Sequence, residues 1–228
     1  MKRWVILILG TLGLLFIVAV VSVAKISTQH RANVISKSEV GKPMLDAPIL
    51  RITDPQRGPQ DAPITITYFT DFACESCSLT WPIVRALENE PQFKGKLHFV
   101  WKDFPAHALV FPESLNLHHA ARCAASQGKF WEFQEAAFAR VQDVRLRVNV
   151  LKDVLGVAGL NNAAMQSCID SPGIASLVND DIDEGKRLAI TATPMFFIND
   201  KRFEGLPEYA MMVGNIRNML AQIEYGKK

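Results

Sequence analysis

The stretch Phe72-Ala73-Cys74-Glu75-Ser76-Cys77 places two cysteines two residues apart, between two segments of different periodicity. The preceding segment, Ile64-Thr65-Ile66-Thr67-Tyr68-Phe69, alternates as a half-buried strand does. In the following segment, apolar residues recur at helical spacing over residues 79–87. The order therefore predicts a strand, a short turn and a helix whose first turn carries both cysteines.

Two cysteines at this spacing can close a small disulfide ring when they lie on the first turn of a helix. A thiolate at Cys74 would face unpaired backbone N–H groups and the positive end of the helix dipole, both of which lower a cysteine pKa. We therefore predict that Cys74 is the attacking sulfur. Cys77, one turn into the helix and more buried, is predicted to be the resolving thiol.

Two other interpretations of the cysteine pair remain open. Cys-x-x-Cys also forms half of a zinc site in other proteins, and two buried cysteines can serve packing or a purely structural disulfide. Zinc normally needs a second pair of ligands close in sequence, whereas Cys123 and Cys168 each stand alone. The strand-then-helix context favours redox chemistry with neither a metal nor a cofactor.

An apolar segment near the N-terminus bears on where the cysteines act. Lys2 and Arg3 precede an uncharged run over residues 4–24, about 30 Å long as a helix, which is enough to span a bilayer. We expect residues 1–25 to be an uncleaved transmembrane signal-anchor, with cleavage at Ser22-Val23-Ala24 as the alternative. Because positive flanks stay in the cytoplasm, the rest of the chain is expected on the periplasmic or outer side of the cell membrane.

The remainder of the chain divides into a polar tether and one domain. Residues 26–50 are polar and lack a sustained period, as a partly disordered linker does. Residues 51–228 are long enough for a single domain with a sizeable core. The formal charge of +2 over the chain is small, so nothing indicates binding to nucleic acid.

Further periodic segments complete the expected fold. Strand character returns at residues 97–101, 195–199 and 201–203, and residues 212–223 predict a closing amphipathic helix. Between them, about residues 106–189 read as helices, with Gly159 suited to end one helix and Asn161 or Asn162 to cap the next. The pattern predicts an α/β fold with a helical insertion.

Several motifs, taken in order and spacing, resemble the DsbA-like thiol–disulfide oxidoreductases of the thioredoxin superfamily from bacterial envelopes. The resemblance covers about residues 51–225. The motifs are Asp61-Ala62-Pro63, Phe69-Thr70-Asp71-Phe72-Ala73-Cys74-Glu75-Ser76-Cys77, Asp103-Phe104-Pro105, Cys123-Ala124 with Gln127-Gly128-Lys129-Phe130-Trp131-Glu132, and Thr193-Pro194-Met195-Phe196-Phe197-Ile198-Asn199.

The resemblance implies a thioredoxin-like fold in which Thr193 and Pro194 form a cis-proline turn facing the cysteines. Without the resemblance, an ordinary trans proline at the start of a strand would be preferred. The residue before such a proline can pair its backbone with an extended substrate strand beside Cys74. The resemblance also implies reoxidation of the pair by a quinone-linked membrane protein.

The sequence departs from the family pattern in three ways, of which the simplest is that Ala192 and Asp200 stand where family members often have glycine, which affects turn geometry more than chemistry. Family members often carry a buried acid six residues before the first cysteine, where this chain has Tyr68. Tyrosine is neutral near pH 7, so Lys102 or a water is expected to take the place of that acid as a proton relay. Glu75, in the dipeptide Glu75-Ser76, opposes thiolate formation at Cys74, so we expect a weaker oxidant than in strongly oxidising relatives.

Cys123 and Cys168 are expected on two different helices of the insertion. In an exported protein an even cysteine count favours a second, structural disulfide, and relatives often carry cysteines at similar places. Two buried free thiols are the alternative.

Histidine and aromatic residues carry weaker signals. His118 and His119 are expected at surface or rim positions rather than at a metal, and His107 near the active face, where it either contacts substrate or is solvated. The tryptophans Trp81, Trp101 and Trp131 are expected in the core. Phe72 and Phe111 are expected either in an apolar rim that receives unfolded chains or in ordinary packing.

The sequence thus predicts a membrane-anchored thiol–disulfide oxidoreductase that exchanges disulfides with exported, unfolded or partly folded proteins. Oxidation of substrate is the favoured direction. A reductase or isomerase with the same two sulfurs and a redox-inert thioredoxin-like interaction module are the alternatives.

Overall fold

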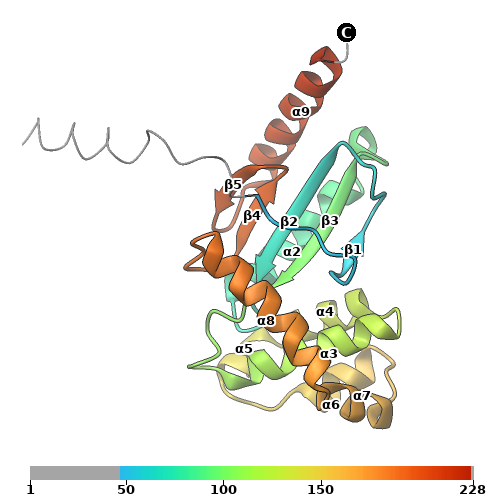
Figure 1. The fold of residues 1–228 in the computed structure, drawn as a ribbon, viewed down its shortest axis with the longest axis vertical. Coiled ribbons are helices and arrows are strands. Elements are labelled where there is room, and N and C mark those ends of the chain that lie inside the picture. Colours follow the sequence, from blue (N-terminus) through green and yellow to red (C-terminus); the bar gives the residue numbers. More distant parts are fainter. Residues whose placement is uncertain (1–46, 227–228) are drawn as a thin grey trace, which may run out of the picture. The chain divides into compact units, whose positions relative to one another are not determined.

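The computed structural model describes residues 47–226, which contain a five-stranded sheet in the order β1-β3-β2-β4-β5 (Figure 1). The predicted transmembrane segment 1–25 lies outside the described residues, as does most of the predicted tether 26–50. Within residues 47–226, no helix is both long and apolar enough to cross a membrane. The strands are β1 (Gln56–Arg57), β2 (Ile64–Thr70), β3 (Leu97–Asp103), β4 (Met195–Ile198) and β5 (Lys201–Glu204).

The two central strands run parallel, with Tyr68 of β2 opposite Trp101 of β3. A parallel pair needs a crossover connection, which is supplied by α2 (Glu75–Glu88) and a short 3₁₀ turn at Pro91–Phe93. β4 lies antiparallel on the other side of β2, and β5 pairs with β4. The four predicted strands, β2 to β5, are confirmed, whereas the edge strand β1 is too short to leave a pattern in the sequence.

The chain between β3 and β4 is helical and forms the predicted insertion. Asn161 caps one of its helices by accepting a hydrogen bond from the backbone N–H of Ala164, and Gly159 ends the preceding one with a φ of +63°. The α/β fold with a helical insertion is therefore confirmed. The helices are α3 (Pro112–Ser126), α4 (Phe130–Phe138), α5 (Val141–Arg145), α6 (Leu151–Val157), α7 (Asn162–Ile169) and α8 (Pro172–Arg187), and α9 (Tyr209–Gly226) follows β5.

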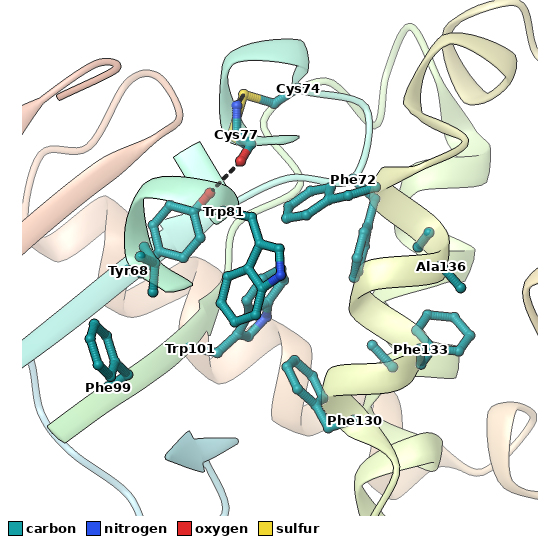
Figure 2. Packing of buried hydrophobic residues seen from close by; sticks show 14 of the residues in the cluster. Tyr68, Phe72, Cys74, Cys77, Trp81, Phe99, Trp101, Phe130, Phe133 and Ala136 are labelled. Carbon is teal, nitrogen blue, oxygen red and sulfur yellow. Dashed lines mark hydrogen bonds between the residues drawn. A yellow bond between two sulfur atoms is a disulfide. The ribbon is translucent and has the colours of Figure 1, made fainter. Parts of the chain in front are cut away.

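One face of the sheet packs aromatic side chains against α2 and the insertion (Figure 2). The ring of Trp101 lies 5.3 Å from that of Phe72 and 5.2 Å from that of Phe130, measured between centroids. Phe72 is fully buried in this cluster. The interpretation of Phe72 as part of an exposed apolar rim is therefore wrong, because its side chain fills the core beneath the turn that carries Cys74.

The other two tryptophans pack on each other. Trp81 of α2 and Trp131 of α4 are stacked, with ring centroids 5.3 Å apart and planes 4° from parallel. Trp81 is buried and Trp131 is half-buried. Core packing is thus confirmed for Trp81 and Trp101, and Trp131 covers the edge of the same core.

The opposite face of the sheet carries a second, smaller apolar cluster. Phe69 of β2 lies there, next to Tyr68 in sequence but on the other side of the sheet, as alternation in a strand requires. Its neighbours include Phe197 of β4 and Leu188, which follows α8. Side chains on this face are therefore separated from α2 and its cysteines by the sheet.

Candidate active site

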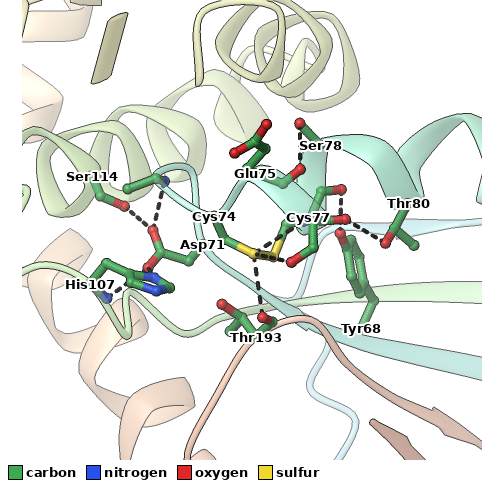
Figure 3. Close-up of a disulfide and its surroundings, with 12 residues drawn as sticks. Tyr68, Asp71, Cys74, Glu75, Cys77, Ser78, Thr80, His107, Ser114 and Thr193 are labelled. Atoms are coloured by element: carbon green, nitrogen blue, oxygen red, sulfur yellow. Dashed lines mark hydrogen bonds and ion pairs between the residues drawn. A yellow bond between two sulfur atoms is a disulfide. The ribbon is translucent and has the colours of Figure 1, made fainter. Parts of the chain in front are cut away.

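Cys74 and Cys77 are joined by a disulfide at the start of α2 (Figure 3), with their Cα atoms 5.2 Å apart. Cys74 is the N-cap residue of the helix and has extended backbone angles. Its Sγ accepts a hydrogen bond from the backbone N–H of Cys77 at 3.1 Å. That N–H is one of the donors that a helix start leaves unpaired, so the same geometry would stabilise a thiolate at Cys74.

The two cysteines differ in how far they are buried. Cys77 is fully buried under the first turn of α2, whereas Cys74 keeps 3% of its surface exposed. An incoming thiol can therefore approach the sulfur of Cys74 more readily than that of Cys77. Cys74 lines an open pocket of about 350 Å³ together with Glu75, Ser76, Leu79, His107, Arg145 and Thr193.

Thr193 and Pro194 approach the disulfide from the start of β4, and the peptide bond between them is cis. The carbonyl oxygen of Thr193 lies 3.4 Å from Cys74 Sγ. A disulfide sulfur carries no proton, so this is a contact, and it becomes a hydrogen bond when Cys74 is a thiol that donates. The sequence-predicted turn and the predicted attacking sulfur are therefore adjacent.

The two residues between the cysteines point in different directions. Ser76 Oγ lies 3.3 Å from Cys74 Sγ, so its hydroxyl can donate a hydrogen bond to that sulfur. Glu75 is exposed in the first turn of α2, where a carboxylate favours the helix through its dipole. The dipeptide therefore sets one donor and one negative charge beside Cys74.

Tyr68 supports the site from below rather than serving its proton chemistry. Its hydroxyl donates a hydrogen bond to the carbonyl oxygen of Cys77 at 2.9 Å, and its ring stacks on that of Phe196. Burial raises the pKa of Tyr68 well above its ordinary value, so the hydroxyl keeps its proton. Tyr68 holds the first turn of α2 in place on the sheet.

Lys102 is not brought to the cysteines, and its predicted role as a substitute proton relay is wrong. Tyr68 and Trp101 are paired across the sheet and share the α2 face, so the next residue, Lys102, points to the other face. There its ammonium pairs with Asp54 at 2.7 Å, Asp181 at 3.1 Å and Glu184 at 3.2 Å.

Lys102 belongs to a larger cluster of buried charges between β3, α3 and α8. Arg122 joins it by pairing with Asp103 and Asp181, and His118 Nδ1 lies 2.6 Å from Asp103. Burial and the nearby Asp103 carboxylate raise the pKa of Asp181 to about 7. The expected surface position of His118 is wrong, because it is fully buried, whereas His119 is half-buried.

A second polar group, which the sequence reasoning did not assign, holds the turn before Cys74. Asp71 is fully buried and accepts hydrogen bonds from the backbone N–H of Ala73 and the backbone and ring of His107, all at 2.7–2.8 Å, and from Ser114. Burial alone raises the pKa of Asp71, but these bonds outweigh it and leave the pKa below its ordinary value. The Asp71 bond conversely raises the pKa of His107, which lies at the pocket as expected.

Arg145, at the end of α5, is a pocket residue that local sequence patterns could not reveal. Its Nη1 donates to the carbonyl oxygen of Ala73 at 3.1 Å, and its guanidinium carbon lies 5.2 Å from the ring centre of Phe111. Phe111 is half-buried under this cation and packs against the main apolar core, so its contacts are those of ordinary packing. Arg145 lies 72 positions from Ala73 and 34 from Phe111, so neither contact leaves a local motif.

Cys123 of α3 and Cys168 of α7 form a second disulfide, with Cα atoms 5.8 Å apart. Cys123 is fully buried and Cys168 is half-buried. The alternative of two free thiols is therefore wrong. For the zinc interpretation, residues 47–226 contain no group of three or more His, Cys, Asp or Glu side chains that could hold a metal ion.

A family model described as thioredoxin (Thioredoxin_4) matches residues 51–218. Among solved structures, alpha-DsbA1 from Wolbachia pipientis has a TM-score of 0.69 and 21% sequence identity, over 79% of this chain and 97% of that chain. Oxidised BdbD from Bacillus subtilis has a TM-score of 0.66 and 24% identity, over 74% of this chain and 94% of that chain. These likenesses show a shared fold.

The curated relatives include an Na(+)/H(+) antiporter NhaA 1 from Mycolicibacterium gilvum, 28% identical over 169 residues. The matched region covers 72% of this chain but 27% of that protein. An Na(+)/H(+) antiporter NhaA 3 from Salinispora tropica is likewise 28% identical, over 80% of this chain and 27% of that protein. The chain thus spans about a quarter of the length of these curated relatives.

Proposed function

The chain belongs to the thioredoxin family whose model matches residues 51–218, and from this premise we propose that it is a thiol–disulfide oxidoreductase acting on exported proteins. The position of Cys74 carries the proposal. Its sulfur caps the start of α2 and contacts the Thr193 carbonyl, and the residue lines an open pocket. A disulfide that served only to stabilise the fold would need none of these three features.

In the oxidising direction, a substrate thiolate attacks Cys74 Sγ in line with its bond to Cys77. That S–S bond breaks, its electron pair leaves on Cys77 Sγ, and a mixed disulfide forms between the substrate and Cys74. A second substrate thiolate then attacks the substrate sulfur of the mixed disulfide and releases Cys74 as a thiolate. The substrate loses two electrons and two protons, and the cysteine pair gains the two electrons.

The surroundings of Cys74 favour its release in the second step. The Cys77 N–H and the Ser76 hydroxyl both lie within hydrogen-bonding distance of the sulfur, and the α2 dipole adds a positive potential. These groups stabilise a thiolate more than a neutral sulfur, because hydrogen bonds to an ionised acceptor are stronger. Cys74 is therefore the better leaving group, and Cys77 the sulfur that closes the ring again.

Exposed apolar side chains, one in the pocket and others next in sequence to pocket residues, suit an unfolded polypeptide as substrate. Leu79 lines the pocket and is exposed, Leu146 and Val148 follow Arg145, and Leu109 and Val110 follow His107. Exposed apolar groups gathered beside a reactive site are typical of surfaces that bind other proteins. An extended substrate segment could also pair its backbone with Thr193.

The compartment and the partners complete the proposal. We place the domain outside the cytoplasm, anchored to the cell membrane by residues 1–25, because both described disulfides suit an oxidising compartment. Oxidation of substrates then leaves Cys74 and Cys77 reduced. A quinone-linked membrane protein is the partner that we propose to reoxidise them.

The test is the oxidative folding of a reduced, unfolded protein in the presence of the full chain in mild detergent. We expect stoichiometric oxidised chain to transfer its disulfide faster than air oxidises the substrate, with loss of the Cys74–Cys77 bond. A matched sample whose Cys74 and Cys77 are alkylated is the control. Equal rates in both samples would contradict the proposal, and activity only on a scrambled-disulfide substrate would assign the chain to the isomerases.

A further inference from the structure

Two residues outside α2 give the wall of the Cys74 pocket a positive charge. Arg145 and His107 both line it, and they are close enough for the Arg145 charge to lower the pKa of His107 against the stronger, opposite effect of Asp71. Asp71 compensates the imidazolium of His107 through their direct bond. Arg145 therefore contributes the uncompensated positive charge of this wall.

Arg145 has no carboxylate within ion-pair distance among residues 47–226. Within this range it contacts the Ala73 carbonyl, which takes one donor, and the face of the Phe111 ring. A guanidinium has five N–H donors in a planar fork, so donors remain for a ligand that enters the pocket. The side chain is half-buried and held at both contacts, so binding would cost little additional rotamer entropy.

The lining of the pocket also carries a negative charge. Glu75 stands in the first turn of α2, next to Cys74, and lines the same pocket as Arg145. A carboxylate that enters the pocket is repelled by Glu75 and attracted by Arg145. The pocket therefore carries charges of both signs. The ligand group that fits Arg145 is a carboxylate, which a guanidinium fork can bind through two parallel bonds.

Resting on the oxidoreductase function proposed above, we propose that Arg145 is a specificity-determining residue that binds a substrate carboxylate close to the reacting cysteine. Substrate thiols flanked by aspartate or glutamate are then preferred over the same thiols flanked by amides. Because the pair forms at a partly exposed site, we expect a preference of about threefold to fivefold, which weakens in high salt.

The experiment compares two dithiol peptides that differ only at the residue after each cysteine, glutamate in one and glutamine in the other. Each is oxidised by the full chain, and its rate is divided by its rate with hydroxyethyl disulfide, which corrects for the reactivity of the peptide thiols. The expected ratio of glutamate to glutamine peptide is about three to five for the wild-type chain. It falls to about one in Arg145→Gln and takes an intermediate value in Arg145→Lys.

Arg147→Gln is the matched control, because it removes the same charge from an exposed residue two positions later, just after α5, that does not line the pocket. Its ratio should equal that of the wild type. A wild-type ratio of one, or a ratio that survives in Arg145→Gln, overturns the inference. Equal slowing of both peptides in Arg145→Gln also overturns it, because Arg145 then acts on Cys74 or the fold. If the wild type oxidises neither peptide, the proposed function itself fails.

Discussion

The Cys74–Cys77 disulfide closes a ring of neighbouring residues at the start of α2, whereas Cys123–Cys168 joins α3 to α7 across 45 positions. The first has an N–H donor, a hydroxyl and an open pocket at one of its sulfurs. In the described part of the chain, no hydrogen bond reaches either sulfur of the second. The same covalent bond thus has two environments, one suited to exchange and one to cross-linking.

The contrast teaches that the position of a cysteine on its helix determines whether its disulfide exchanges readily. Cys74 caps α2, so its thiolate would be stabilised by the helix start. Cys123 lies within α3, where the backbone N–H groups are already bonded, and it is fully buried. A thiolate at Cys123 would have no comparable stabilisation, so its bond should resist exchange.

Removing Cys74 should have the largest effect and tests the first half of the contrast. We expect Cys74→Ser to lower the rate of substrate oxidation by at least about a thousandfold, because the attacked sulfur is gone. Cys77→Ser, in contrast, should retain reactivity at Cys74 and accumulate mixed disulfides with substrate. Non-reducing gel electrophoresis and mass spectrometry distinguish the two. Activity retained in Cys74→Ser would exclude the enzymatic role and favour a redox-inert interaction module.

Removing the second disulfide tests the other half. The double variant Cys123→Ala with Cys168→Ala should lose up to about 4 kcal/mol of unfolding free energy, since the bond closes a long loop in the unfolded chain. Substrate oxidation by the folded variant should stay within about twofold of the wild type. Urea denaturation and the oxidation rate measure the two quantities. A folded variant that has lost its activity would show that Cys123–Cys168 takes part in exchange.

The local part of this contrast could be predicted from sequence. Alternation in β2, helical spacing after Cys77 and the separation of the cysteines by two residues are all encoded within 25 positions. The turn at Thr193 and Pro194 required the family resemblance, because an isolated Thr-Pro has no spacing that marks it as facing a cysteine. The fold and the two reacting sulfurs can therefore be predicted from the sequence together with the family resemblance.

The roles of residues that act through distant contacts could not be predicted from the sequence. Lys102 is predicted as a proton relay, but alternation in β3 places it on the face of the sheet opposite to Trp101, away from the cysteines. His118 appeared to be a surface residue because its partner Asp103 lies on another element. Arg145 and Asp71 reach the site through contacts that span tens of residues, and such pairing leaves no periodic signal in one sequence.

Asp71→Asn sharpens the comparison by loosening only the turn that presents Cys74. Near pH 7 we expect a loss of about 1–3 kcal/mol in unfolding free energy, because an amide cannot accept all the bonds of the buried carboxylate. The lowered pKa of Asp71 means that its contribution is present above about pH 4 and is lost as the pH falls through the folded-state value.

The difference between Asp71→Asn and the wild type should therefore narrow below about pH 4. Denaturation curves at several pH values provide the measurement. The matched control is Asp180→Asn, an exposed position on α8 with no ion pair among the described residues, which should change stability little at any pH. A pH-independent difference for Asp71→Asn would contradict the assigned role of its charge.

The smallest effect is expected from Glu75→Gln, which tests the negative charge beside Cys74. Without that charge, the thiolate of Cys74 should form more readily, so the pair should become more oxidising by up to about 30 mV. Glu224→Gln, an exposed position near the end of α9, removes the same charge away from the pocket and should leave the potential unchanged. Equal shifts of the redox potential in both variants would show that the shift comes from the net charge of the chain and not from the position of Glu75.

The most direct test follows both disulfides in one titration. The full chain is equilibrated with glutathione redox buffers, its thiols are alkylated, and mass spectrometry assigns the modified cysteines. We predict that Cys74 and Cys77 become reduced at a potential between about −120 and −270 mV, while Cys123 and Cys168 remain oxidised throughout that range. Reduction of Cys123–Cys168 before Cys74–Cys77, or of both bonds in the same window, would contradict the separation into an exchanging and a cross-linking disulfide.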